Sequence, residues 1–233
     1  MDKVLVIIPA YNEEENIKRV VDNLIQNYPQ YDYVVVNDGS KDNTYKICEE
    51  NGYRCLNLPV NLGLAGAFQT GMKYAYRKGY DYAIQYDADG QHRAEYIEPM
   101  LEEMRTGRYD IVIGSRFVTE KKPSSLRMLG SNMIALAISL TTGRKIKDPT
   151  SGMRMFNRNV IKECAKNINY GPEPDTVSFL IKNGASVSEI QVEMDERIAG
   201  ESYLNAINSI KYMFRMLVSI VVIQNFRKRD EKR

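Results

Sequence analysis

Short runs of β-forming apolar residues alternate with helix-like segments along the first half of the chain. Nearly continuous runs occupy residues 4–9, 33–38, 82–87 and 110–115, and a weaker run occupies residues 55–58. The segments between them have the apolar spacing and charged faces of helices; they are residues 13–28, 41–51, 64–78 and 94–106. Unbroken apolar strands that alternate with helices are typical of parallel strands buried on both faces. We therefore predict an α/β fold with a mostly parallel, doubly wound sheet and helices on both of its faces.

The second half of the chain carries more helix and fewer strands. Residues 124–143 have the pattern of a helix that stops near Gly143, and residues 148–156 that of a turn followed by a strand. Residues 173–192 predict a helix, a glycine stop and a strand. No repeat or flexible linker interrupts the pattern, so we predict one domain over residues 1–205.

The C-terminal segment, residues 203–229, has the spacing of one helix. Its apolar stripe consists of Ile207, Ile210, Phe214, Leu217, Val218 and Val221. Lys211 and Arg215 interrupt any membrane-spanning stretch, and residues 227–233 hold five basic and two acidic side chains. We predict an amphipathic helix with a basic tail over residues 206–233. Three roles are consistent with it: packing on the domain, pairing with a second subunit, or lying in a membrane interface.

Composition narrows the class of protein. The chain has 233 residues, of which 43% are hydrophobic and 27% are charged, and these values are ordinary for a globular domain. The net charge of +2 gives no reason to expect a nucleic-acid partner. Cys48, Cys55 and Cys164 are odd in number and lack CxxC spacing, so we expect a reducing compartment and no zinc or disulfide framework. The N-terminus leads directly into a strand-like run, so no signal peptide is expected and a cytoplasmic location is predicted.

Polar residues gather where the predicted strands end. PAYNEEEN follows the first strand, NDGSKDNT the second, DADGQH the run at 82–87, and GSR the run at 110–115. Loops are polar for general reasons, but four polar strand ends at one edge of a parallel sheet favour a shared ligand site. Within NDGS, Asp38 is placed to accept hydrogen bonds from a ribose or a base, although lone Asp-Gly turns are also common.

The stretch IQYDADGQH places Asp87, Asp89 and Gln91 at alternate positions. Side chains at such positions share one side of an extended backbone, provided that Gly90 does not break the extension. Their oxygens suit Mg²⁺ or Mn²⁺, and magnesium is often held by one or two carboxylates together with substrate phosphates. The alternative is an acidic pair in an ordinary turn. His92, which follows, is consistent with a donor contact or with capping of the next helix.

Taken together, the motifs resemble a known family. IIPAYNEEENI, VVVNDGSKDNT, NLGLAGAFQTGMKYA, YDADGQH, GSR, DPTSGMRMF and ERIAGES occur in the order found in family 2 glycosyltransferases of the GT-A fold. The resemblance is strongest to the dolichyl-phosphate mannose synthase-like and polyprenyl-phosphate glycosyltransferase branch, and it covers roughly residues 3–205. It implies inverting transfer of a sugar from a nucleotide-diphosphate donor to a polyprenyl-phosphate or a cell-surface glycan, with Mg²⁺ or Mn²⁺ as Lewis acid.

The resemblance also implies roles for individual residues. The metal ligands would be Asp89 and Gln91. The donor nucleotide sugar would contact Pro9, Ala10, Tyr11, Glu13, Asp38, Asp87, Ala88 and Arg116. Asp148 of DPTSGMR would act as a base or only orient the acceptor, and Arg197 would grip phosphate oxygens. A turn or capping role for Asp148 is the alternative. On the acceptor side we predict Arg154, Glu173, Asp175 and Ser202, although the spacing in GPEPDTVSF departs from the branch.

Two other functions compete with this interpretation. A nucleotidyltransferase that makes nucleotide sugars would share the sheet and the metal, but it would be expected to carry a glycine-rich basic loop after the first strand, and PAYNEEEN has none. A non-catalytic glycan-assembly subunit would be favoured by loss of Asp89 or Asp148, and both are present. We therefore predict a metal-dependent glycosyltransferase, cytoplasmic or peripheral at the inner face of the cell membrane, with homo-oligomerisation left open.

Overall fold

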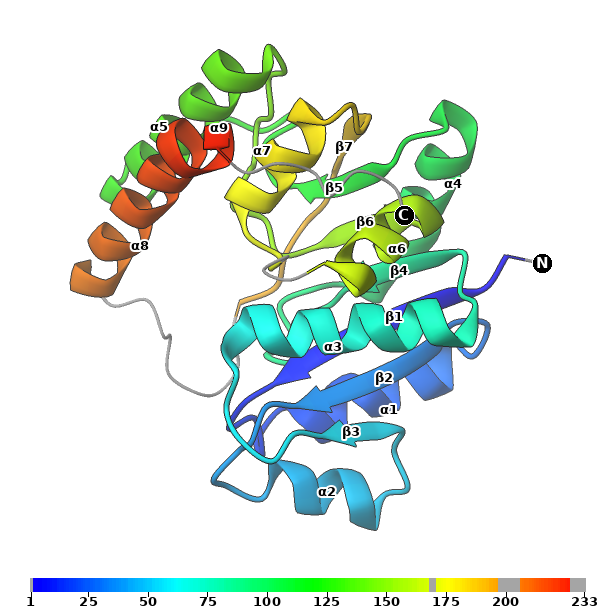
Figure 1. Cartoon of the computed structure of the whole chain (residues 1–233). Helices are drawn as coiled ribbons and strands as arrows, with labels where there is room; N and C mark the ends of the chain where they lie inside the picture. The colour runs from blue at the N-terminus through cyan, green and yellow to red at the C-terminus, as the bar shows by residue number, and fades with distance from the viewer. Residues whose placement is uncertain (1, 168–170, 197–205, 227–233) are drawn as a thin grey trace.

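The computed structural model describes residues 2–167, 171–196 and 206–226 (Figure 1). Within these residues seven strands form one sheet in the order β3-β2-β1-β4-β6-β5-β7. Their bounds are β1 (Val4–Ala10), β2 (Asp32–Asn37), β3 (Cys55–Asn57), β4 (Tyr82–Gln85), β5 (Ile111–Ser115), β6 (Arg154–Asn157) and β7 (Val187–Gln191). β1 to β4 pair in parallel and β7 pairs in parallel with β5, whereas β6 lies antiparallel between β4 and β5. The predicted, mostly parallel α/β sheet is confirmed.

Helices cover both faces of the sheet (Figure 1). Their bounds are α1 (Ile17–Asn27), α2 (Thr44–Glu50), α3 (Gly63–Lys78), the 3₁₀ turn η1 (Ala94–Tyr96), α4 (Ile97–Gly107), α5 (Leu126–Thr142), α6 (Arg158–Lys166), α7 (Pro174–Lys182), α8 (Ala206–Val218), the π-helical turn η2 (Ser219–Ile223) and α9 (Gln224–Phe226). The core on one face joins α1, α2 and α4 to the sheet, and the other joins α3, α5, α6, α7 and α8. The sequence pattern did not predict α6.

From here on, the C-terminal segment means α8, η2 and α9 together, residues 206–226. It packs beside α5 at one side of the molecule (Figure 1). Gly130 of α5 allows the close approach, since a Cβ there would lie 1.5 Å from the Met213 sulfur. The buried residues of the segment are Met216, Ser219, Ile220 and Gln224. From the predicted apolar stripe, by contrast, Phe214 and Val221 point outward and are 69% and 48% exposed. Leu217 of the same stripe is half-buried and packs against the core, so the stripe lies only partly on the surface that packs on the domain.

Candidate active site at the carboxyl edge of the sheet

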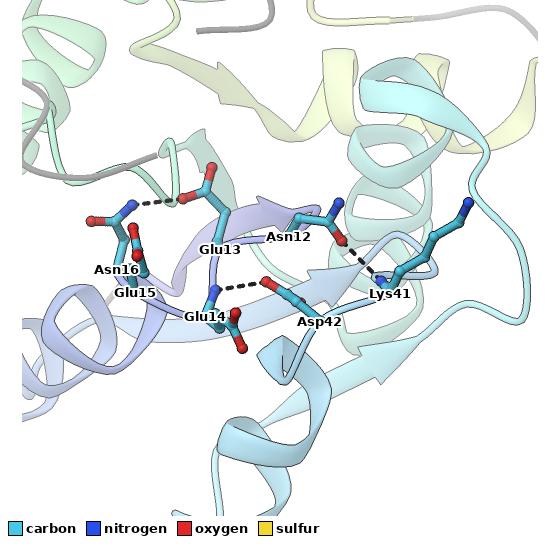
Figure 2. A pocket seen from close by; sticks show the side chains of 7 residues that line it. All are labelled: Asn12, Glu13, Glu14, Glu15, Asn16, Lys41 and Asp42. Carbon is cyan, nitrogen blue, oxygen red and sulfur yellow. Dashed lines mark hydrogen bonds between the residues drawn. The ribbon is translucent and has the colours of Figure 1, made fainter. Parts of the chain in front are cut away.

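The loops after β1 and β2 are joined side by side by hydrogen bonds between backbone amides and short polar side chains. The Asn12 amide donates to Ser40 Oγ at 3.0 Å, and the Glu13 amide donates to Thr44 Oγ1 at 2.8 Å. In return, Asn12 Oδ1 accepts from the Lys41 amide at 2.9 Å (Figure 2). α1 begins at Ile17 rather than at residue 13, and residues 12–14 are instead hydrogen-bonded to the neighbouring loop.

These loops carry the first group of predicted donor contacts. Ala10 is buried, Pro9 and Glu13 are half-buried, and the Tyr11 ring is 41% exposed. Glu13 Oε2 accepts from Asn16 Nδ2 at 2.9 Å, which fixes the direction of that carboxylate (Figure 2). A cavity of about 320 Å³ opens beside them; it is lined by Asn12, Glu13, Glu14, Glu15, Asn16, Lys41 and Asp42.

Asp38 lies at the end of β2, next to the Ala10 carbonyl that accepts its backbone N–H at 2.8 Å. Its side chain is buried, and its Oδ1 accepts from the Leu62 amide at 2.7 Å. Burial raises the pKa of Asp38, and hydrogen bonds from the Leu62 and Gly63 amides oppose that rise. Gly39 follows with φ of +64°, and a Cβ there would lie 2.7 Å from the Val60 carbonyl carbon, so only glycine fits this turn. The predicted base or ribose contact of Asp38 therefore lies in a tightly built corner.

The DADG segment corrects one expectation. β4 ends at Gln85, the backbone turns over residues 88–90, and Gly90 has φ of +77°. Asp89 Oδ1 accepts from the Gln91 amide at 3.0 Å, as expected for an aspartate that closes its own turn. The predicted alternation of Asp87, Asp89 and Gln91 along one extended strand is therefore wrong, because Gly90 breaks the extension. The three residues therefore follow one another through a turn rather than along a strand.

His92 is held against Asp87 in a defined orientation. The imidazole is buried; its Nδ1 accepts from the Asp87 backbone N–H at 2.9 Å, and its Nε2 lies 3.5 Å from Asp87 Oδ2. A neutral ring whose Nδ1 accepts carries its proton on Nε2, facing the carboxylate. The N-cap of η1 is Arg93, so His92 does not cap the next helix. The geometry adds a role that the sequence did not predict, orientation of Asp87.

Arg19 of α1 supports the same turn from the other side. Its Nη2 donates to the Asp89 carbonyl at 3.4 Å, and a Cβ on Gly90 would lie 2.3 Å from that nitrogen. The guanidinium therefore lies flat against Gly90. Arg19 could not be predicted from the sequence, because nothing in its local pattern distinguishes it from other charged residues on the outer face of α1.

Asp148 and Arg116 form a buried ion pair at the end of β5. Asp148 is fully buried; its Oδ2 accepts from Arg116 Nε at 2.7 Å and its Oδ1 from Arg116 Nη2 at 2.9 Å. Thr150 Oγ1 donates to Oδ1 at 3.2 Å, and Glu189 Oε1 accepts from the Asp148 amide at 2.8 Å. Burial favours the neutral carboxyl, but the hydrogen bonds and charge of Arg116 outweigh it and lower the pKa of Asp148. Both carboxylate oxygens are thus occupied, which favours an orienting role over that of a free base.

Gly152 brings the Asp148 loop, residues 148–153, against the DADG turn. A Cβ at this position would lie 2.6 Å from Asp87 Oδ2 and 3.2 Å from His92 Cε1. The predicted donor residue Asp87 therefore lies against the loop that carries the predicted catalytic residue Asp148, although about sixty residues of sequence separate them.

Three predicted acceptor residues, Arg154, Glu173 and Asp175, already have hydrogen-bond partners within the protein. Arg154 is 1% exposed, and its two terminal nitrogens donate to the backbone carbonyls of Pro149 and Pro172. Contact with an acceptor phosphate would require this guanidinium to leave both carbonyls. Glu173 and Asp175 face the C-terminal segment, where they accept hydrogen bonds from Arg215 and Ser219. Arg197 and Ser202 fall outside the described residues.

Asp87, Asp89 and Gln91 fit a magnesium or manganese ion by their chemistry, since two carboxylates and an amide supply only hard oxygen ligands. Within residues 2–167, 171–196 and 206–226, no cluster of three or more His, Cys, Asp or Glu side chains has metal-binding geometry. Magnesium is often held by one or two carboxylates together with waters and the phosphates of a substrate.

The family model for glycosyl transferase family 2 matches residues 5–165, more than half of the chain. This chain belongs to glycosyl transferase family 2. The match covers all the strand ends described above, from PAYNEEEN to DPTSGMR. The resemblance inferred from the motifs is thereby confirmed, and neither the nucleotidyltransferase nor the non-catalytic subunit is supported.

Curated relatives in family 2 extend over most of this glycosyltransferase. The UDP-N-acetylglucosamine--dolichyl-phosphate N-acetylglucosaminyltransferase of Methanococcus voltae is 32% identical, over 82% of this chain and 86% of the relative. The polyprenol monophosphomannose synthase of Mycolicibacterium smegmatis is 30% identical, over 92% of this chain and 85% of the relative. The names of the two relatives differ in the sugar and agree in a polyprenol-type lipid.

Solved structures confirm the GT-A fold of the glycosyltransferase. Glucosyl-3-phosphoglycerate synthase from Mycobacterium tuberculosis, crystallised with Mn²⁺, uridine diphosphate and phosphoglyceric acid, superimposes with a TM-score of 0.70 at 16% identity. The superposition covers 96% of this chain and 78% of that one. At this identity the likeness concerns the fold, and the ligands in that crystal are those of the mycobacterial enzyme.

Proposed function

We propose that this glycosyltransferase transfers a sugar from a nucleoside diphosphate sugar to a polyprenyl phosphate, with inversion at the sugar carbon. The acceptor class agrees with the names of the two relatives. The observation that carries the proposal is the Asp148–Arg116 pair. A hydroxyl acceptor needs a general base and a phosphate acceptor does not, and the pair bears on whether Asp148 can be that base.

A hydroxyl acceptor has to lose a proton as it attacks, so a glycan acceptor calls for a general base beside it. Asp148 is a poor base, since both of its oxygens accept hydrogen bonds from Arg116 and its pKa is lowered. A phosphate monoester is already ionised near neutral pH and attacks without a base. The lipid phosphate is therefore the acceptor that suits this site.

The donor side of the proposal uses the loops after β1, β2 and β4. Asp38 would hold the base or ribose and Asp87 the ribose, while Pro9, Ala10, Tyr11, Glu13 and Ala88 would form the walls. Asp89 and Gln91 would hold Mg²⁺ or Mn²⁺, which when bound supplies positive charge for the leaving diphosphate. His92 and Arg19 would keep the turn that carries these residues in shape.

On the acceptor side, Asp148 would orient Arg116, whose planar guanidinium is suited to phosphate oxygens. A quarter of the Arg116 side chain is exposed while Asp148 is fully buried, so the arginine is the member of the pair that a substrate can touch. An acceptor oxygen held there would form the new bond to the sugar carbon as the bond to the nucleoside diphosphate breaks. Arg197 and Ser202 stay predictions for the same phosphate.

We further propose that the enzyme meets its lipid acceptor at the membrane surface through α5 and the C-terminal segment. No helix in the described residues is long and apolar enough to cross a membrane. Both elements nevertheless expose large apolar side chains: Leu129, Met133, Leu136 and Leu140 on α5, and Phe214, Val221, Val222, Ile223 and Phe226 on the C-terminal segment. The basic residues of the tail agree with an anionic lipid surface.

The function is tested by incubating the purified chain with a panel of nucleoside diphosphate sugars and with either undecaprenyl phosphate or a free glycan, in the presence of Mn²⁺. We expect one donor to yield a lipid-linked sugar phosphate detectable by mass spectrometry, with the opposite anomeric configuration. Transfer to the glycan alone, or to neither acceptor, would refute the proposal.

The membrane contact is tested by sedimentation with anionic vesicles. Leu136→Asp with Leu140→Asp should leave the enzyme in the supernatant, whereas Ile25→Asp, a change at an exposed apolar residue of α1, should not. If the first variant instead abolishes a dimer seen by analytical ultracentrifugation and leaves vesicle binding unchanged, the surface pairs two copies of the chain.

A further inference from the structure

The C-terminal segment is attached to the N-terminus of α7 by polar contacts as well as by apolar packing. Arg215 Nη2 donates to Glu173 Oε1. Asp175 Oδ2 accepts from Ser219 Oγ at 2.6 Å and from Gln224 Nε2 at 3.3 Å. These contacts fix where the segment lies on the domain, because apolar packing alone would tolerate sliding.

The π-helical turn η2 explains how Ser219 and Gln224 reach the same carboxylate. In an α-helix, residues five apart point roughly 140° away from each other. A π-helical turn closes hydrogen bonds from i to i+5, which places such residues one above the other. Gln224 Nε2 indeed lies 3.4 Å from Ser219 Oγ, and both contact Asp175. The irregular turn therefore serves the attachment to α7.

Arg154 continues the connection from α7 to the Asp148 loop. One terminal nitrogen of its buried guanidinium donates to the carbonyl of Pro172, the residue before Glu173, and the other donates to the carbonyl of Pro149 at 2.6 Å. Pro149 is the neighbour of Asp148 in the chain. A single side chain thus joins the segment before α7 to the loop that carries the buried ion pair.

The link depends on the two backbone carbonyls that accept from the buried Arg154 guanidinium. Burial lowers its pKa, while the charges of Tyr212, Asp148, Asp87 and Asp175 oppose that shift. In the described part of the chain its Nε has no hydrogen-bond partner, and neither has Oε1 of Gln85, which faces it across β4 and β6. A shift of Pro172 would leave a buried cation short of a second acceptor, so the loop at Pro149 follows the movement.

We propose that Glu173, Asp175 and Arg154 are positioning residues that couple the C-terminal segment to the Asp148 loop. This rests on the proposed function, in which the C-terminal segment lies on the lipid surface. The position of the segment would then set how Asp148 and Arg116 are oriented toward the lipid phosphate.

The test compares three full-length variants. Arg215→Gln and Ser219→Ala each remove one contact with α7 and leave Arg154 untouched. Lys211→Gln makes the same charge change as Arg215→Gln at another exposed position of α8. Hydrogen exchange followed by mass spectrometry reports on residues 148–153, and residues 4–10 of β1 serve as the internal control for overall stability.

We expect Arg215→Gln and Ser219→Ala to speed exchange at residues 148–153 by about three- to tenfold, with residues 4–10 and the Lys211→Gln variant unchanged. The KM for polyprenyl phosphate should rise by a similar factor, while the affinity for the nucleoside diphosphate stays within about twofold. Unchanged exchange at residues 148–153 in both variants would overturn the coupling. Because exchange needs no substrate, that result is distinct from a failure to find lipid-phosphate transfer.

Discussion

The two sides of the site are held together by different forces. On the donor side, the loops after β1 and β2 are joined by hydrogen bonds that the backbone amides of Asn12 and Glu13 donate to the neutral hydroxyls of Ser40 and Thr44. On the acceptor side, the contacts involve buried charges: Asp148 accepts from Arg116, and Arg154 donates to two backbone carbonyls. Neutral contacts lose little when one is removed, whereas each buried charge depends on its partner. The donor side should therefore tolerate substitution and changes of pH better than the acceptor side, except at the metal ligands.

The largest effect is expected at Asp89. Replacement by alanine removes a carboxylate from the proposed metal site, so binding of a nucleoside diphosphate in the presence of Mn²⁺ should weaken by more than about 100-fold. Isothermal titration calorimetry measures this directly, and Glu102→Ala, a change at an exposed carboxylate of α4, is the matched control. Undiminished binding in Asp89→Ala would show that this turn does not hold the metal.

The second effect concerns stability on the acceptor side. Arg116→Ala leaves the Asp148 carboxylate buried without its cation, which should lower the free energy of unfolding by about 3 kcal/mol. Lys46→Ala breaks an exposed ion pair with Glu50, in which the side chains are 66% and 60% exposed, and should cost less than about 0.5 kcal/mol. Urea unfolding of both variants measures the difference. An equal loss of unfolding free energy in the two variants would contradict the special dependence of the acceptor side on buried charges.

The donor side could be predicted from the sequence because it is built from strand ends that follow one another along the chain. Parallel strands bring their carboxyl ends to one edge, so PAYNEEEN, NDGS and DADG meet without any knowledge of tertiary contacts. The family motifs added the acceptor residue Asp148. Even here the backbone of DADG was predicted as extended, since the alternation of Asp87 and Asp89 does not reveal that Gly90 turns the chain.

The acceptor side resisted prediction because its contacts join residues that are far apart in the sequence. The pairing of Arg116 with Asp148 spans 32 residues, and that of Asp175 with Ser219 spans 44. A charged residue such as Arg154 is expected at the surface unless its partners are known, and here those partners are backbone carbonyls. The outward direction of Phe214 likewise depends on which face of α8 meets α5, which helical periodicity leaves open.

A smaller effect separates backbone strain from support of the DADG turn. Gly90→Ala places a side chain at φ of +77° and against the Arg19 guanidinium, whereas Gly79→Ala, at φ of +75°, meets nothing within 4 Å. Both should lose about 1–2 kcal/mol from the left-handed backbone. Only Gly90→Ala should also weaken nucleoside diphosphate binding, and adding Arg19→Ala should recover part of the lost stability. Equal behaviour of the two glycines would mean that Arg19 does not shape the turn.

The smallest effect is a pair of opposite pH dependences on the acceptor side. Arg116 holds the folded pKa of Asp148 below its ordinary value despite burial, so this group stabilises the fold above that value and loses its contribution as pH falls through the folded pKa. Burial raises the folded pKa of Glu173, which the charge of Arg215 only partly opposes, so its contribution is present below the ordinary value and is lost as pH rises through the folded pKa.

Urea unfolding of the wild type, Asp148→Asn and Glu173→Gln from about pH 3 to about pH 7 measures both dependences. The difference between wild type and Asp148→Asn should grow with pH on the acid side, and the difference between wild type and Glu173→Gln should shrink as pH rises. Parallel curves would contradict the assignment of the two carboxylates. Opposite slopes would place them in different environments: Asp148 has its pKa lowered by its arginine, and Glu173 has its pKa raised by burial where the C-terminal segment covers it.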